Sequence, residues 1–345
     1  MTAAPPFPTP FPSATGLVLS RRSLLRAGAG VCGALAAGGL AFPLRAAVPG
    51  PETTLRIADY KALDGLALES AGLLPTPYKA NFAEFASGNL IVEAINAGAI
   101  DIGSSSEIPP AFGVTAGARM SIVAVVKDDV NWQVVLVPPN SPIQSIADLK
   151  GKRVGYVRAT TTQYYLAKML GEAGLRFTDI KAVALTPAEG NSALEQGALD
   201  AWAIYGYSVP SAIKKGARVL KTSNGYLSGN YLYLASPDAL ADPAKSAAIG
   251  DFLLRLRRAL AWRAANLETW AKIHSSAIGV PLEVDLEILW KNSRQRDLAP
   301  ITDADVVSAQ NVADTFHQLG VLPRAIDMAP AFDRRFNDIL SQPLG

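Results

Sequence analysis

The chain has 345 residues, with 32 basic against 30 acidic side chains, two His and one Cys. A hydrophobic share of 49% and a charged share of 18% indicate an ordinary globular protein, not a disordered or fibrous one. So few His and Cys residues exclude most metal sites and Cys–His nucleophile pairs, and the balanced charge argues against a nucleic-acid-binding protein.

Residues 1–46 have the pattern of an export signal. They hold four of the basic residues and no acidic one, so 28 basic and 30 acidic residues remain beyond them. The pair Arg21-Arg22 precedes Leu24-Leu25 and an uncharged, glycine-containing stretch over residues 27–44. We therefore expect a twin-arginine (Tat) signal and a periplasmic protein, with a plain secretory signal as the alternative.

The rest of the chain alternates between strand and helix patterns, which predicts an α/β fold with mainly parallel sheets. Strands are expected over residues 55–58, 100–102, 121–126, 132–137 and 152–157. Two long helical patterns, over residues 249–273 and 303–319, are expected to pack on the outside of a first lobe.

Polar side chains in the two long patterns are expected to be structural. The run of arginines in the first pattern is interpreted as a solvated face. His274 and His317 are interpreted as ordinary helix residues away from any cleft. The arginines are Arg255, Arg257, Arg258 and Arg263.

One segment occurs twice, 99 positions apart. Residues 94–101 and 193–200 share the pattern Ala, apolar, two variable positions, Gly, Ala, apolar, Asp. In each copy a helix is expected to end at the glycine, which can take the left-handed conformation, and a strand to follow. The repeat makes two similar α/β lobes plausible, with chance as the alternative.

Two hydroxyl triplets follow expected strands. Ser104-Ser105-Ser106 comes after residues 100–103, and Thr160-Thr161-Thr162 opens the helix after residues 154–157. Ligands gather at the carboxyl ends of strands in open α/β sheets, and helix N-termini attract anions. Such a site can hold a sulfonate or another oxyanion without a dedicated cation, although Arg158 could contribute. Helix capping is the competing interpretation of each triplet.

Further candidates lie in other loops. Ser87-Gly88-Asn89 opens a helix, and Tyr205-Gly206-Tyr207 follows an expected strand; tyrosine offers an apolar wall and one hydroxyl to an organic anion. Tyr60, Asp59 and Glu107 lie in or near these loops, and either carboxylate could receive a ligand amine. No nucleophile elbow, phosphate-binding loop, H-E-x-x-H or dinucleotide fingerprint is present, so neither catalysis nor a cofactor is expected.

Several motifs together resemble one family: the solute-binding proteins of ABC importers for aliphatic sulfonates, within the sulfonate/nitrate/taurine group. The resemblance covers most of residues 53–330. The motifs that carry it are Phe85-Ala86-Ser87-Gly88, Gly98-Ala99-Ile100-Asp101-Ile102-Gly103, Ile108-Pro109-Pro110, Asn140-Ser141-Pro142-Ile143, Ala147-Asp148-Leu149-Lys150-Gly151-Lys152-Arg153-Val154, Leu185-Thr186-Pro187-Ala188 and Asp200-Ala201-Trp202-Ala203-Ile204.

The resemblance implies a type II periplasmic binding fold, with two α/β lobes joined by a two-crossover hinge and the ligand in the cleft. It places lobe 1 at residues 53–138 and 233–330, lobe 2 at residues 139–232, and the hinge near Val137-Pro138 and Tyr233-Leu234. It also implies a monomer that delivers a small organic anion to a membrane permease by closing the cleft.

The cleft segments depart from the family pattern, as in Ser105-Ser106-Glu107 before Ile108, so other ligands stay open: taurine, nitrate or a heteroaromatic thiamine precursor. An exported enzyme and a sensory or partner-binding module are the alternatives from other classes. The predicted ligand-binding residues are Tyr60, Ser87, Gly88, Asn89, Ser105, Ser106, Glu107, Thr160, Thr161, Thr162, Tyr205 and Tyr207.

Overall fold

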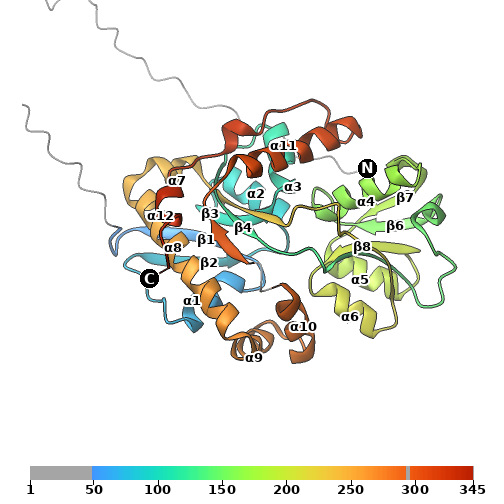
Figure 1. Cartoon of the computed structure of the whole chain (residues 1–345), viewed down its shortest axis with the longest axis horizontal. Coiled ribbons are helices and arrows are strands. Elements are labelled where there is room, and N and C mark those ends of the chain that lie inside the picture. Colours follow the sequence, from blue (N-terminus) through green and yellow to red (C-terminus); the bar gives the residue numbers. More distant parts are fainter. Residues whose placement is uncertain (1–48, 293–295, 345) are drawn as a thin grey trace, which may run out of the picture. The chain divides into compact units, whose positions relative to one another are not determined.

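A computed structural model describes residues 49–292 and 296–344, and their strands form two sheets (Figure 1). The export signal expected in residues 1–46 lies outside the described residues. The chain is the α/β protein that the alternating patterns predict. No helix among the described residues is both long and apolar enough to cross a membrane.

The first sheet has six strands, and parallel and antiparallel pairs occur in it together. Its strands are β1 (Thr54–Asp59), β2 (Lys79–Glu84), β3 (Ile102–Ser106), β4 (Ser121–Lys127), β10 (Asn230–Ala235) and β11 (Asp297–Ala299). Their order is β11-β4-β10-β3-β1-β2. β1 is parallel to β2 and β3, whereas β10 is antiparallel to β3 and β4, and β11 is antiparallel to β4.

The second sheet repeats this plan with five strands. They are β5 (Gln133–Val137), β6 (Arg153–Tyr156), β7 (Lys181–Ala184), β8 (Ala201–Tyr205) and β9 (Arg218–Thr222), in the order β7-β6-β8-β5-β9. β6 is parallel to β7 and β8, and β5 is antiparallel to β8 and β9. The expectation of mainly parallel sheets was therefore wrong. Strand–helix alternation predicts parallel neighbours, but it does not reveal the strand with which a returning strand pairs.

The chain passes between the sheets twice. The first connection joins β4 to β5 over residues 128–132, and the second joins β9 to β10 over residues 223–229. The lobe boundaries predicted from the sequence differ from these points by several residues, because β5 belongs to the second sheet and the start of β10 to the first. Both strands are apolar and buried, so composition alone does not assign them to a sheet.

The repeated segment occupies equivalent places in the two sheets. Residues 94–101 span the end of α2 (Gly88–Asn96) and the approach to β3, and residues 193–200 span the end of α5 (Pro187–Glu195) and the approach to β8. β3 lies beside β1 as β8 lies beside β6. Gly98 and Gly197 both adopt left-handed conformations, with φ of 68° and 70°, as expected where a glycine ends a helix.

The final aspartate of each copy has the same partner. Asp101 accepts hydrogen bonds from the backbone and the guanidinium of Arg56, and Asp200 accepts the same bonds from Arg153. The Nη2–Oδ1 distance is 2.7 Å in both pairs. The repeat therefore has a structural role. In each copy, the aspartate that directly precedes one strand bonds to an arginine near the start of the neighbouring strand.

Helices cover both faces of each sheet (Figure 1). On the first sheet, one face packs against α1, α7 and α8 and the other against α2, α3 and α11; on the second sheet, α4 covers one face and α5 and α6 the other. The remaining bounds are α1 (Leu63–Ser70), α3 (Ile108–Thr115), α4 (Thr161–Glu172), α6 (Ser208–Lys214), α7 (Pro237–Ala241), α8 (Pro243–Ala265), α9 (Leu267–Ile278), α10 (Leu282–Asn292), α11 (Asp303–Gln318) and α12 (Asn337–Leu340), with short 3-10 turns at Ile146–Leu149, Phe177–Asp179 and Ala329–Ala331.

The C-terminal helices pack on the first sheet as predicted, with two corrections. The pattern over residues 249–273 forms two helices, because Asn266 leaves the helical conformation and its side chain donates to the Trp262 carbonyl. The interpretation of the arginine run as a solvated face is wrong for Arg263. It is 1% exposed and lies over the Trp270 ring.

Candidate functional site

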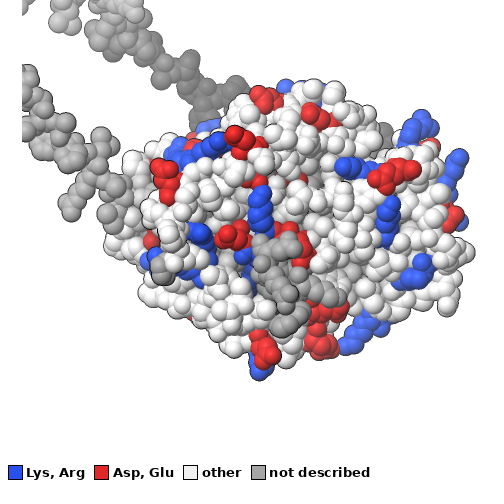
Figure 2. Space-filling view, in the orientation of Figure 1, with Lys and Arg blue, Asp and Glu red and all other residues white. Residues whose placement is uncertain are grey.

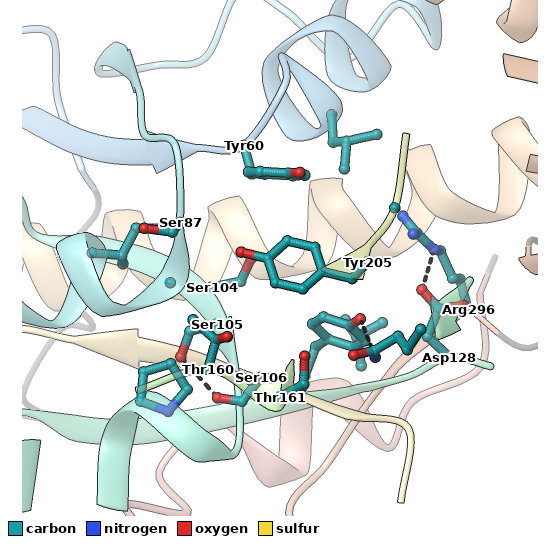
Figure 3. Close-up of a pocket in the computed structure, with 18 of the residues that line it drawn as sticks. Tyr60, Ser87, Ser104, Ser105, Ser106, Asp128, Thr160, Thr161, Tyr205 and Arg296 are labelled. Carbon is teal, nitrogen blue, oxygen red and sulfur yellow. Dashed lines mark hydrogen bonds and ion pairs between the residues drawn. The ribbon is translucent and has the colours of Figure 1, made fainter. Parts of the chain in front are cut away.

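A cavity of about 180 Å³ lies where the strand-end loops of the two sheets meet (Figure 3). The first sheet contributes the residues after β1, the end of β3 and the start of α2; the second contributes the start of α4 and the residues after β8. This is the edge at which open α/β sheets bind ligands. Nine of the twelve predicted residues line the cavity: Tyr60, Ser87, Gly88, Ser105, Ser106, Thr160, Thr161, Tyr205 and Tyr207.

Two helices begin at one end of the cavity. Ser87 precedes α2 and Thr160 precedes α4, yet neither side chain accepts a hydrogen bond from a backbone N–H of its own helix. Within α4, the Thr160 hydroxyl pairs only with the Thr162 hydroxyl, at 3.1 Å. Thr160 donates to the Val157 carbonyl instead, and the Ser87 hydroxyl has no hydrogen bond within the described residues. Helix capping thus does not explain either hydroxyl. Both first turns keep backbone N–H groups for another acceptor, and an anion here would meet two positive helix ends.

Gly88 allows the start of α2 to lie against β3. A Cβ atom at this position would lie 2.7 Å from the Cβ of Ser105, closer than real side chains approach. The glycine therefore lets Ser87 and Ser105 line the same end of the cavity, and Figure 3 shows both near Thr160 and Thr161.

Aromatic side chains line the middle of the cavity. Burial raises the pKa of Tyr60 to about 12 and raises the pKa values of Tyr205, Tyr207, Tyr231 and Tyr233 further. All five phenols therefore stay neutral at physiological pH. They offer hydroxyl donors and apolar faces but no negative charge.

An ion pair lies at the other end of the cavity. The Arg296 Nε lies 2.5 Å from the Asp128 Oδ2, and both residues line the cavity (Figure 3). Burial lowers the pKa of Arg296, but the charge of Asp128, the phenols of Tyr207 and Tyr231 and the hydrogen bond to Asp128 together outweigh this effect, so the net pKa is raised. The guanidinium is thus permanently charged and is paired with the Asp128 carboxylate.

Two further carboxyl groups lie under the loop after β1. Asp59 accepts the backbone N–H groups of Asp64 and Gly65, and Asp64 accepts the Tyr233 hydroxyl at 2.7 Å. Burial raises the pKa of Asp64 to about 7, and the charge of Asp59 adds to the effect. Around neutral pH this group is partly protonated, so the carboxyl groups repel an anion less than their number implies.

Three predicted residues lie outside the cavity lining. The Thr162 hydroxyl bonds to the backbone N–H and carbonyl of Val157. The Glu107 carboxylate accepts hydrogen bonds from Ser228 of the second connection, from Asn230 at the start of β10 and from Ser308 of α11. Thr162 and Glu107 therefore hold the scaffold, and the third residue is Asn89. Arg158 is exposed and lies outside the lining.

His274 lies closer to the cavity than the sequence predicted. Its side chain is fully buried, its Nδ1 lies 3.0 Å from an Asp285 carboxylate oxygen, and its Nε2 lies 2.7 Å from the Lys61 carbonyl. Its ring also contacts Tyr207, at 5.9 Å between centroids. The interpretation of His274 as a helix residue away from the cleft was therefore wrong, since its partners come from separate segments.

Comparison with known proteins is consistent with this geometry. The profile of the family described as NMT1/THI5 like matches residues 81–259. A protein of Escherichia coli strain K12 named as an aliphatic sulfonates-binding protein is 34% identical over 289 residues, which cover 82% of this chain and 89% of the relative. A Bacillus subtilis protein with the same name is 27% identical, over 93% of this chain and 94% of the relative.

The chain belongs to the NMT1/THI5-like family, among its aliphatic sulfonate-binding proteins. The solved alkanesulfonate-binding protein SsuA of Xanthomonas axonopodis, bound to MOPS, matches with a TM-score of 0.76 and 29% identity, over 84% of this chain and all of that one. The periplasmic Escherichia coli SsuA matches at 0.71 and 31%, over 84% and 92%. The fold is therefore that of the periplasmic sulfonate-binding proteins.

The same fold also carries an enzyme. The desulfurization enzyme DszB matches this chain with a TM-score of 0.60 and 13% identity. This level of identity shows a shared fold alone. The chain's one cysteine, Cys32, lies outside the described residues, and no cysteine lines the cavity. No group of three or more His, Cys, Asp or Glu residues that could hold a metal ion occurs in residues 49–292 and 296–344.

No sequence pattern identified Arg296 or Asp128 as a cavity residue. The register of β11 on β4 sets Asp297 opposite Lys127, so the next residues on the two strands meet as a pair at the cavity. Nothing in the sequence links positions 168 residues apart. Asp128 has one local signal, since it follows directly on β4 where the chain leaves the first sheet.

Proposed function

We propose that the chain is the periplasmic solute-binding component of an ABC importer, and that it captures a sulfonate and delivers it to a membrane permease. The relatives named for aliphatic sulfonates support the ligand class. The observation that carries the proposal is the pair of uncapped helix starts, at Ser87 and Thr160, which meet at one end of the cavity. A sulfonate has three acceptor oxygens and one charge, which these donors match.

In this proposal the headgroup lies against the two helix starts and the organic part lies among the tyrosines. Thr161 adds a hydroxyl donor, and Ser105 can add one if its hydroxyl turns away from the Ser106 carbonyl, to which it now donates. The two connections at residues 128–132 and 223–229 act as the hinge, so the division into lobes follows the sheets. The protein acts as a monomer, and the cleft closes on the ligand.

The proposal includes export of the chain. The leader with Arg21-Arg22 is expected to direct the chain through the twin-arginine route before residues 1–46 are removed. Replacing both arginines by lysine should leave the protein in the cytoplasm, as fractionation would reveal. Periplasmic protein from that double variant would favour the plain secretory signal.

A thermal-shift screen tests the ligand class. The panel holds alkanesulfonates, taurine, arylsulfonates, nitrate, sulfate and a thiamine pyrimidine. A ligand at a thousand times its Kd adds about 4 kcal/mol to the folded state, which corresponds to a shift of several degrees at roughly 2–4 °C per kcal/mol. A shift confined to sulfonates supports the proposal, and a shift with another compound alone would replace the ligand class.

Two further outcomes address other classes of function. Chemical change of a bound sulfonate on long incubation would favour the enzyme alternative that the DszB fold raises. Normal sulfonate uptake in a strain without the gene would favour a sensory or partner-binding role. On the face shown in Figure 2, basic and acidic side chains are interspersed, so this face offers no continuous basic patch for nucleic acid.

A further inference from the structure

Aromatic rings are concentrated in the cavity. Six of its twenty-five lining residues are aromatic, against 8% of the whole chain. They come from both sheets, so the rings surround the space between the helix starts and the Arg296–Asp128 pair. They are Tyr60, Trp132, Tyr205, Tyr207, Tyr231 and Tyr233.

Three of these rings have no aromatic partner among the residues that the structure describes. Buried aromatic rings usually pack against one another with centroids about 4.5–7 Å apart. Tyr207 has such a contact with His274, and Tyr233 has one with Phe252. No ring contact involves Tyr60, Tyr205 or Tyr231 within residues 49–292 and 296–344. Tyr231 and Tyr205 also pack against the apolar core, but all three residues line the cavity, so part of each side chain faces the ligand space.

Tyr60 and Tyr205 approach the ligand space from opposite sheets. Figure 3 shows the two rings between the cluster of Ser and Thr side chains and Arg296. A Cβ atom at Gly206 would lie 3.8 Å from the Tyr60 hydroxyl, and Gly206 has a φ of 65°. The tip of Tyr60 thus lies within van der Waals reach of the loop that follows Tyr205.

The volume limits the size of the organic part. An apolar protein cavity of about 150 Å³ holds one benzene molecule. The present cavity, at about 180 Å³, has space for one six-membered ring and a sulfonate group at the polar end. Two fused rings with a sulfonate would have to extend beyond this space toward the open side of the cavity.

Resting on the proposed function, we propose that the cavity selects sulfonates attached to a single aromatic ring. The sulfonate meets the helix starts at Ser87 and Thr160, and the ring lies between Tyr60 and Tyr205. A flat ring gains offset or edge contacts with these side chains and loses no chain rotors on binding, whereas a flexible alkyl chain loses several.

The first test compares two ligands of similar size on the full chain by titration calorimetry. Benzenesulfonate and cyclohexanesulfonate differ in the π-system but share the headgroup and the ring size. Benzenesulfonate should bind about three- to tenfold more tightly, and 2-naphthalenesulfonate should bind more weakly than benzenesulfonate. Equal affinity of the matched pair, or tighter binding of cyclohexanesulfonate, overturns the selection. Absence of binding by every sulfonate overturns the proposed function itself, so the two failures are distinguishable.

The second test measures whether substitutions in the cavity change the preference for benzenesulfonate over cyclohexanesulfonate. Tyr205→Leu and Tyr60→Leu should each bring the ratio of the two affinities close to one. Tyr156→Leu is the matched control, because Tyr156 packs edge-on against Phe177 outside the cavity, and it should keep the ratio. An unchanged ratio in both cavity variants overturns the assignment of these rings. Because a general loss of stability lowers the affinity for both ligands, it should leave the ratio of the two affinities unchanged.

Discussion

Two adjacent threonines at the start of α4 have different roles, one in lining the cavity and one in holding the backbone. Thr161 lines the cavity, whereas the Thr162 hydroxyl is bonded to both backbone groups of Val157. The sequence marked the triplet as a whole, because hydroxyls after a strand are typical of both ligand binding and capping. Distinguishing its members needs the direction in which each side chain leaves the helix.

Thr161→Ala should therefore change mainly the affinity for the ligand, and Thr162→Ala mainly the stability of the protein. The first removes a donor to an anion and should weaken sulfonate binding about tenfold, with little change in stability. The second leaves the buried backbone N–H of Val157 without its partner and should lower the free energy of unfolding by about 1–2 kcal/mol, with affinity retained. Calorimetry and denaturant unfolding measure the two quantities. Equal stability losses with unchanged affinity would return Thr161 to a capping role.

Asp64 gives a prediction on pH at the same scale. Because its folded pKa of about 7 lies above the ordinary value of 3.8, its contribution to stability is full below about pH 4 and is lost as the pH rises to about 7. Asp64→Asn should thus gain about 1–3 kcal/mol relative to the native chain between pH 4 and pH 8.

Unfolding by denaturant at several pH values measures this difference. Asp200→Asn is the control with the opposite sign, because the hydrogen bond from Arg153 lowers the pKa of Asp200. The native chain should exceed that variant in stability near neutral pH and lose the advantage on acidification. A flat difference for Asp64→Asn would contradict the raised pKa.

Connections between helices and strands have the weakest local sequence patterns. Most features that the sequence did not predict therefore lie in these connections. Gly229 has a φ of 80°, and a Cβ atom there would lie 2.0 Å from the Asp128 carbonyl oxygen. The two connections between the sheets thus touch at this point, where the Asp128 N–H donates to the Gly229 carbonyl at 2.9 Å. Neither residue belongs to a motif.

Gly229→Ala should cost far more stability than an alanine at another left-handed glycine. Gly72 is the matched control, with a φ of 68° and no atom within 4 Å of its Cβ position. Gly72→Ala should cost about 1 kcal/mol from the conformation alone. Gly229→Ala adds a backbone clash and should cost about 3 kcal/mol or more. Similar losses in denaturant unfolding would show that the connections tolerate separation.

The loop between β1 and α1 depends on a helix distant in the sequence. Lys61 and Ala62 are both left-handed, with φ of 54° and 52°, and the Lys61 carbonyl is held by His274. His274→Gln should lower the free energy of unfolding by about 3 kcal/mol and weaken sulfonate binding, because Tyr60 precedes this loop. His317→Gln, at the chain's other histidine, should do neither to that extent. Lost stability with unchanged affinity would show that other contacts hold the loop.

For the whole molecule, the sequence predicted more of the scaffold than of the cavity's charged end. Motifs such as Ile108-Pro109-Pro110 and the repeated Gly–Asp segment are local, so one stretch of sequence contains each of them. Arg296 instead reaches the cavity through the pairing of β11 with β4. Long-range pairing is a property of the folded sheet, and a single sequence carries no direct signal of it.

The contact between the two connections makes a final prediction about the whole molecule. Asp128 bonds to Gly229 through its backbone and to Arg296 through its side chain, so the hinge proposed here shares a residue with the cavity wall. A ligand that draws the two sets of loops together should therefore turn the sheets about this point, and small-angle scattering should record a smaller radius of gyration at saturation. Thr161→Ala, at a ligand concentration below its weakened Kd, should show little of this change. An unchanged radius in the native chain, with saturation proven by calorimetry, would contradict the hinge and leave a cavity that binds its ligand without closing.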